Sequence, residues 1–314
     1  MTRYVVRRLL VFVPALMVVA IFVGLMIDLM PGDPAMLLVG IESPGEAINK
    51  KRIELGLDRP IHERLAEWVF NALQGDFGES YFLNQTVTET IAERYEVTIS
   101  LAVFALVVGI VVGVPIGIIA SVKQGQFIDW LVTTSALLWL SIPGFWIALN
   151  LIFLFSVSLG WFPMAGFVPI TENPLNFLKH LVLPATSMGL GLSGIIARFT
   201  RTSMLEVLRQ DYICTARAKG LCQRVVLLRH ALRNALIPII TMVGIGFGDM
   251  LGGAVLTELI FSMPGVGRMV LDAVKRRDYP VVQGGVFVVT ATYLAVNLVV
   301  DMLYAWADPR IHYE

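Results

Sequence analysis

VTISLAVFALVVGIVVGVPIGIIAS, residues 97–121, is a run without a charged side chain. An α-helix rises about 1.5 Å per residue, so about 20 such residues cross the roughly 30 Å of hydrocarbon in a bilayer. Similar apolar runs occur at residues 9–30, 130–158, 181–200, 236–257 and 281–305. Transmembrane β-strands are alternating segments of only about ten residues. The sequence therefore predicts an all-α, polytopic membrane protein with six transmembrane helices.

The composition of the whole chain supports this fold class. Hydrophobic residues make up 56% of the sequence and charged residues 15%, and the mean hydropathy is +0.74. Soluble domains carry roughly 45–50% apolar and about 25% charged residues. A water-soluble domain is therefore excluded, and membrane lipid is the expected surrounding. The formal net charge is zero, which gives no reason to expect nucleic acid as a partner.

The distribution of basic residues predicts the orientation, because short loops rich in Lys and Arg stay in the cytoplasm. With the N-terminus inside, the short inner segments hold 13 Lys and Arg and the short outer loops hold five. Both termini are therefore expected in the cytoplasm. The predicted divisions are an N-terminus with the first span (1–30), an extracytoplasmic loop region (31–95), a five-helix transmembrane core with a basic cytoplasmic loop (96–305, loop 198–235) and a cytoplasmic tail (306–314).

Motifs of nucleotide binding and catalysis are absent or lie in the wrong context. The sequence lacks the phosphate loop G-x-x-x-x-G-K-[ST], the zinc motif H-E-x-x-H, the G-x-S-x-G elbow and C-x-x-C. The glycines of residues 189–194 match the dinucleotide-binding pattern, but they lie inside a predicted span, where small residues let helices pack closely. The glycines between 244 and 253 receive the same interpretation, as a close crossing or a flexible gate. No residue is expected to be catalytic or to bind a metal, and the chain is not expected to be an enzyme.

Four acidic residues fall within the predicted spans, where a charge at mid-bilayer costs at least ~2.5–3.5 kcal/mol. Asp28, Glu258 and Asp301 lie near span ends, so interfacial solvation or helix capping is expected for them. Asp249 lies midway along the fifth span. Two interpretations of Asp249 remain open, an interior polar contact and a place on a solute path.

The stretch DYICTARAKG, residues 211–220, has the signals of a short helix. Asp211 suits the N-cap, Arg217 and Lys219 suit the negative end of the helix dipole, and Gly220 suits the left-handed position after the last turn. A helix of this length spans only about 13 Å, so it is expected to lie along the inner membrane face. Two interpretations remain, a plain surface helix and a docking helix for another protein. The candidate docking residues are Asp211, Tyr212, Cys214, Thr215, Ala216, Arg217, Ala218, Lys219 and Gly220.

At this stretch the sequence resembles the permease subunits of ABC importers. Their cytoplasmic EAA loop begins with small residues, followed four positions on by glycine and later by a proline that opens the next span. Cys214-Thr215-Ala216, Gly220 and Pro238 occupy those places, although the Glu of the loop is absent. The long spacing between Gly220 and Pro238 is that of the dipeptide/oligopeptide (Dpp/Opp-like, B-type) branch.

Further matches to that branch follow in order along the chain. They are Pro31-Gly32-Asp33-Pro34, Leu55-Gly56-Leu57-Asp58-x-Pro60, Gly75-Asp76-Phe77-Gly78-x-Ser80, Arg277-Asp278-Tyr279-Pro280-Val281 and Asp308-Pro309-Arg310-Ile311. The resemblance implies a type I ABC importer permease fold in the bacterial inner membrane.

The resemblance also implies partners and a solute. The expected partners are a second homologous permease subunit, two ATP-binding subunits that hold ATP and magnesium, and an extracytoplasmic solute-binding protein; no cofactor is expected in this chain. Residues 211–220 would dock on an ATP-binding subunit, with Ala216 facing it. The implied solute is a dipeptide, an oligopeptide or a similar small molecule. The alternatives are a permease for nickel chelates or glutathione, an ion-driven secondary transporter, and a structural membrane subunit.

Overall fold

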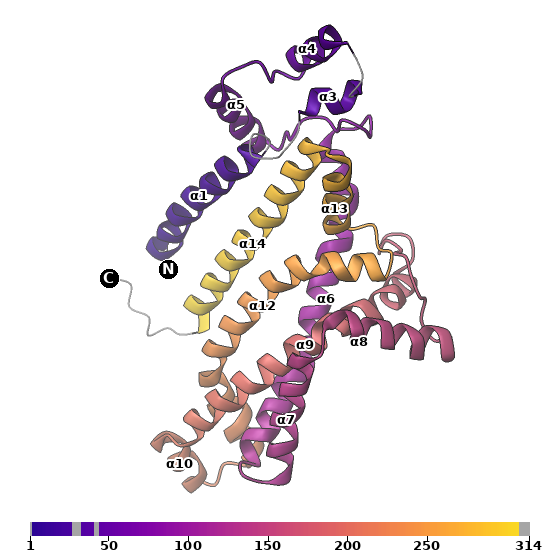
Figure 1. The fold of residues 1–314 in the computed structure, drawn as a ribbon. Coiled ribbons are helices and arrows are strands. Elements are labelled where there is room, and N and C mark those ends of the chain that lie inside the picture. The colour runs from indigo at the N-terminus through magenta and orange to yellow at the C-terminus, as the bar shows by residue number, and fades with distance from the viewer. Residues whose placement is uncertain (1, 27–32, 41–43, 308–314) are drawn as a thin grey trace. The chain divides into compact units, whose positions relative to one another are not determined.

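The computed structural model describes residues 2–26, 33–40 and 44–307, and within these ranges the regular elements are helices (Figure 1). The predicted all-α class is confirmed. In chain order the elements are α1 (Thr2–Gly24), α3 (Pro34–Val39), α4 (Gly45–Glu54), α5 (Ile61–Leu73), α6 (Val87–Val122), α7 (Phe127–Ser141), α8 (Gly144–Leu151), the π-helix η1 (Ile152–Ser158), α9 (Pro174–Leu208), α10 (Asp211–Ala218), α11 (Gln223–Val225), the π-helix η2 (Val226–Ala231), α12 (Leu232–Ile260), α13 (Val266–Arg276) and α14 (Tyr279–Ala307).

Four helical segments of the described chain are long and apolar enough to cross a membrane. They are Val87–Val122, Pro174–Leu208, Gln223–Ile260 and Tyr279–Met302; the first three contain the predicted spans 97–121, 181–200 and 236–257, and the fourth covers most of 281–305. Most extend beyond the apolar run, because polar residues outside the bilayer continue the helix. The first predicted span, 9–30, corresponds to the shorter apolar helix Leu10–Gly24, and its end at 27–30 lies outside the described residues.

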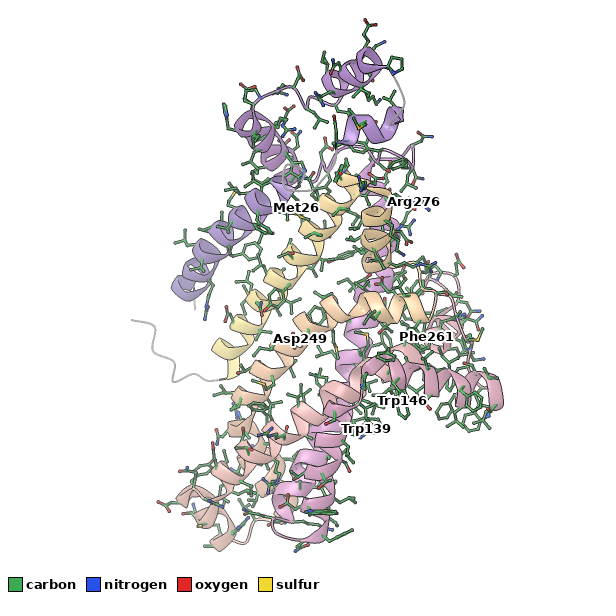
Figure 2. All side chains as sticks on the ribbon, in the orientation of Figure 1. Met26, Trp139, Trp146, Asp249, Phe261 and Arg276 are labelled. Carbon is green, nitrogen blue, oxygen red and sulfur yellow. The ribbon has the colours of Figure 1, made fainter. Side chains whose placement is uncertain are left out.

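The third predicted span, 130–158, is wrong as a single helix. The chain leaves the helical conformation at Ile142 (φ −85°, ψ 125°) and resumes it at Gly144. Pro143 is the cause, because proline has no N–H for the helical ladder and disfavours helical backbone in the residue before it. Trp139 and Trp146 lie on the two sides of this break (Figure 2).

The described chain divides into two compact units. Of the described residues, the large unit comprises 2–8, 97–263 and 295–307, and the small unit comprises 9–26, 33–40, 44–96 and 264–294. Within the large unit, α9 packs against α7, α8 and α12.

Glycines bring the helices of the large unit into backbone contact. A Cβ atom added at Gly117 of α6 would lie 2.5 Å from the carbonyl oxygen of Ala197, and one at Gly189 of α9 would lie 2.6 Å from that of Ala105. A Cβ at Gly194 would lie 2.9 Å from the carbonyl oxygen of Ala136 on α7. The packing interpretation of the glycines at 189–194 is therefore confirmed at these two positions, as expected for small residues in lipid.

In the small unit, hydrogen bonds connect two of the sequence motifs that carried the resemblance, 75–80 and 277–281. The Oγ of Ser80 donates a hydrogen bond of 2.5 Å to Asp278, and the backbone N–H of Tyr81 donates to the same carboxylate at 3.2 Å. Gln283 of α14 donates from Nε2 to the carbonyl oxygens of Val23 and Gly24, at 2.9 and 3.1 Å. Carbonyls at a helix C-terminus lack partners within the helix, so this side chain completes the end of α1.

Candidate functional site

The short helix predicted at 211–220 is present as α10, which ends in a Schellman motif. Gly220 has φ +76°, its N–H donates to the carbonyl of Arg217 at 2.9 Å, and the N–H of Leu221 donates to that of Ala216 at 3.3 Å. Both bonds satisfy carbonyls that the helix leaves unpaired. The predicted left-handed glycine is confirmed. The N-cap is Gln210 rather than Asp211, because the chain is still extended at 210 (ψ 146°), and Asp211 lies in the first turn.

One face of α10 is buried against the chain itself. Ile213 and Ala216 are 0% and 7% exposed and belong to an apolar cluster. The other buried members are Met204 from α9, Val226 and Ala231 from η2, and Ala235 from α12. The expectation that Ala216 faces a partner is therefore wrong, because its methyl group packs inside the loop. We call these six residues the loop cluster.

The opposite face of α10 is exposed and made of short side chains. Asp211, Cys214, Thr215 and Ala218 recur at helical spacing along this face. We call these four residues the docking face. Tyr212 lies beside it, and its hydroxyl accepts a hydrogen bond of 2.7 Å from Nδ2 of Asn234 in the first turn of α12. The loop cluster and this bond together fix α10 to the ends of α9 and α12.

A partly buried ion pair joins the start of α7 to the end of α9. Arg201 donates from Nε to Oδ1 of Asp129 at 2.5 Å and from Nη2 to Oδ2 at 2.8 Å. The N–H of Gly125 adds a third bond of 3.0 Å, and Asp129 is only 6% exposed. The Arg201 hydrogen bonds lower the pKa of Asp129 below its ordinary value, although burial opposes the shift. From the sequence, Arg201 counted only as one of the basic residues that set the orientation.

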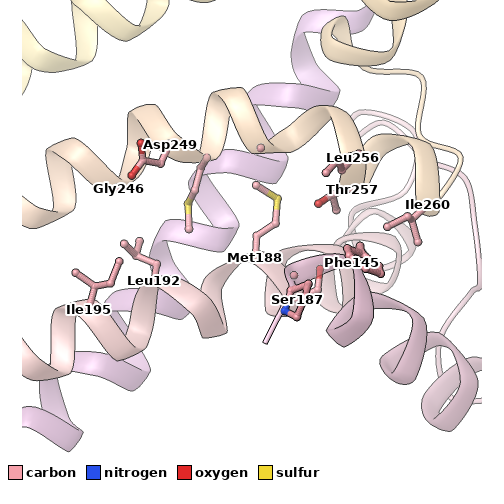
Figure 3. Close-up of a pocket in the computed structure, with 14 residues that line it drawn as sticks. Phe145, Ser187, Met188, Leu192, Ile195, Gly246, Asp249, Leu256, Thr257 and Ile260 are labelled. Carbon is pink, nitrogen blue, oxygen red and sulfur yellow. The ribbon is translucent and has the colours of Figure 1, made fainter. Parts of the chain in front are cut away.

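The deep acid Asp249 lies at a cavity of about 440 Å³ between α8, α9 and α12 (Figure 3). The lining is mostly apolar and comprises Pro143, Gly144, Phe145, Ser187, Met188, Leu192, Ile195, Gly246, Asp249, Met250, Gly253, Leu256, Thr257 and Ile260. The break at Pro143 contributes to the site, since it starts the helix that forms one wall. A Cβ at Gly246 would lie 2.3 Å from Leu192, whereas one at Gly253 would meet nothing within 4 Å. The predicted close contact between helices is therefore found at Gly246 and is not found at Gly253.

One of the other intramembrane acids differs from expectation. Glu258 is 0% exposed and accepts a hydrogen bond of 2.6 Å from the hydroxyl of Thr98, so interfacial solvation is wrong for it. The protein itself covers this end of α12. Asp301 forms an ion pair with Arg8 at 3.0 Å. Asp28 lies outside the described residues.

Two families match the chain over nearly its whole length. The family described as "Binding-protein-dependent transport system inner membrane component" matches residues 113–313. Its N-terminal companion, a membrane component of the same transport systems, matches residues 1–102. Helix α10, the cavity and the Asp129–Arg201 ion pair all lie within the first match.

Individual relatives agree with this match. A protein of Brucella suis biovar 1 (strain 1330), named for a peptide transport system permease, is 44% identical over 100% of both chains. The glutathione transport system permease protein GsiC of Escherichia coli (strain K12) is 40% identical over 100% of both. Among solved structures, a chain of the MetNI methionine ABC transporter in an inward-facing conformation is similar, with 16% identity and a TM-score of 0.55. The matched region is 69% of this chain and 96% of that chain. This likeness concerns the fold alone, and the predicted type I permease fold is confirmed.

Proposed function

The chain belongs to the binding-protein-dependent transport system inner membrane components, and from this we propose that the solute it translocates is a short peptide or peptide-like molecule. It is a permease subunit of an ABC importer, a multi-pass membrane protein that works with ATPase and solute-binding partners. The peptide assignment is supported by relatives named for peptide and for glutathione transport, since glutathione is itself a tripeptide. A nickel chelate remains the second candidate of this branch.

Four kinds of subunit make up the proposed assembly. This chain and a second homologous permease would form the pathway, and an extracytoplasmic binding protein would deliver the solute. Two ATP-binding subunits would hold ATP and magnesium, while this chain holds neither and has no ATPase activity of its own. The proposal is supported by the lack of a phosphate loop and by the apolar cavity on α8, α9 and α12.

One observation carries the proposed coupling, namely that α10 is attached to the two longest walls of the cavity. The loop cluster joins it to α9 and η2, and Asn234 joins it to α12. An ATP-binding subunit seated on the docking face would move α10 when ATP closes the ATPase pair. Packed cores move as units rather than deform, so α9 and α12 would move with it. Asp249 and its neighbours would thereby face alternate sides of the membrane.

Reconstitution tests this function. The purified complex in proteoliposomes, supplied with ATP and the loaded binding protein, is expected to accumulate a dipeptide and to hydrolyse ATP several-fold faster than without peptide. Dissipating the proton and sodium gradients should leave uptake unchanged. Uptake that needs an ion gradient and ignores ATP would favour a secondary transporter instead. Hydrolysis stimulated by a nickel chelate and by no peptide would favour the second solute class.

The native cysteines provide a test of orientation. Cys214 and Cys222 are exposed and lie in the loop predicted to be cytoplasmic. A membrane-impermeant maleimide added to intact cells is therefore expected to leave both unlabelled, while a permeant maleimide labels Cys222. The matched control is Lys50→Cys in a chain without other cysteines, which should be labelled from outside. Labelling of Cys222 with protection of residue 50 would reverse the proposed topology.

A further inference from the structure

The cavity around Asp249 contains an acid without a basic neighbour in its wall. Its fourteen lining residues include no Lys, Arg or His. The lining residues with a hydroxyl group are Ser187 and Thr257. The Oγ of Ser187 already donates a hydrogen bond to the carbonyl of Pro184 at 2.7 Å. Asp249 is exposed at this cavity and lies midway along a predicted membrane span, where a carboxylate is costly unless a cation accompanies it. The described residues of the wall supply none.

The backbone around Asp249 leaves its carboxylate accessible. Gly246 and Gly253 lie one turn before and one turn after it among the α12 residues that line the cavity, so these two neighbours add no side chain beside it. The space beside Gly253 is open for at least 4 Å. Met188 and Leu192 form the facing wall on α9 (Figure 3).

We propose that Asp249 makes this cavity selective for solutes that carry an ammonium group next to an apolar group. The inference rests on the proposed function and names its substrate class. An ammonium would pair with the carboxylate, and the apolar remainder would lie against Met188, Met250 and Leu256. The ammonium can come from a peptide N-terminus or from a lysine side chain. A solute without a cation would leave the carboxylate unpaired in an apolar wall.

The first test measures charge selectivity without any assumption about the natural solute. Gly253→Cys, in an assembled complex with Cys214 and Cys222 replaced by serine, places a thiol where a side chain fits. We expect the ratio of its reaction rates with a cationic and a neutral methanethiosulfonate to fall about tenfold when Asp249→Asn is added, because two unit charges a few ångströms apart attract strongly at low dielectric. Asp272→Asn, an exposed acid of α13, is the control and should leave the ratio unchanged.

The second test connects this selectivity to transport. Uptake of a dipeptide with a free N-terminus is compared with uptake of its N-acetylated form and of an N-acetylated lysine peptide. Asp249→Asn is expected to lower the ratio of free to acetylated uptake about tenfold, and the lysine peptide shows whether a side-chain ammonium serves equally.

The outcomes separate the two proposals. A thiol ratio that Asp249→Asn does not change would overturn the inference and indicate a basic residue from the partner permease. Loss of free and acetylated uptake to the same degree would also overturn it, since the acid would then be structural. A tenfold thiol effect without uptake of any peptide would overturn the proposed peptide function and leave the cation site standing.

Discussion

Ala218→Trp is expected to reduce transport by more than tenfold and to release the ATP-binding subunits during purification. Ala218 is exposed on the docking face, where only short side chains allow a second surface to come close. Added volume in a close-packed contact costs typically ~1–3 kcal/mol, and about 1.4 kcal/mol is a tenfold change in binding. The measurement is peptide uptake together with the amount of ATPase that co-purifies with a tagged permease.

The controls for this variant come from the same loop. Leu228→Ala changes an exposed residue of η2 and should leave both measurements near the wild-type values, whereas Val226 is fully buried and is unsuitable as a neutral site. Ala216→Trp is the contrast, because its side chain would enter the loop cluster and should lower the melting temperature as well. Normal ATPase retention by a well-expressed Ala218→Trp complex would show that partners bind elsewhere.

Arg201→Ala is expected to lower the free energy of unfolding by about 3 kcal/mol, at the lower end of what breaking a buried ion pair costs. The variant leaves the Asp129 carboxylate, which is 6% exposed, without its two guanidinium bonds. Partial access of water to Arg201, whose side chain is 26% exposed, reduces the effect. Thermal unfolding of the purified complex measures it, and Arg209→Ala, an exposed arginine of the same loop, is the control.

A second substitution tests the reason for that loss. Asp129→Asn combined with Arg201→Ala removes the stranded charge, so the double variant should be more stable than Arg201→Ala alone. Equal stability of the single and double variants would mean that the pair contributes by packing rather than by charge.

The pH dependence of the same pair follows from the lowered pKa of Asp129. A carboxyl whose pKa is lower in the folded state stabilises it above the unfolded value of about 3.9. That contribution is lost as pH falls through the folded pKa. The wild type should therefore lose this contribution to its own stability only below about pH 4, and a loss that begins near neutral pH would contradict the assignment.

The helices were predictable because each transmembrane run is a property of neighbouring residues. The break at Pro143 was missed because it lies within an unbroken apolar run, where hydropathy is the same on both sides. In α10, length and left-handed end were predictable from capping residues. The orientation of Ala216 was not, because it depends on Met204 and Val226, which the fold brings together. The Asp129–Arg201 pair spans 72 positions and has no local signal.

The contact between Gly246 and Leu192 is a point of close packing between α9 and α12 at the cavity. At this point a methyl group on Gly246 would lie 2.3 Å from a terminal methyl of Leu192, so it would fit only if that side chain shifted. The loop cluster and α10 lie toward one end of the two helices, and the cavity up to Thr257 and Ile260 lies toward the other. A larger side chain at residue 246 is therefore expected to push Leu192 aside and to change the part of the cavity wall that α9 and α12 share.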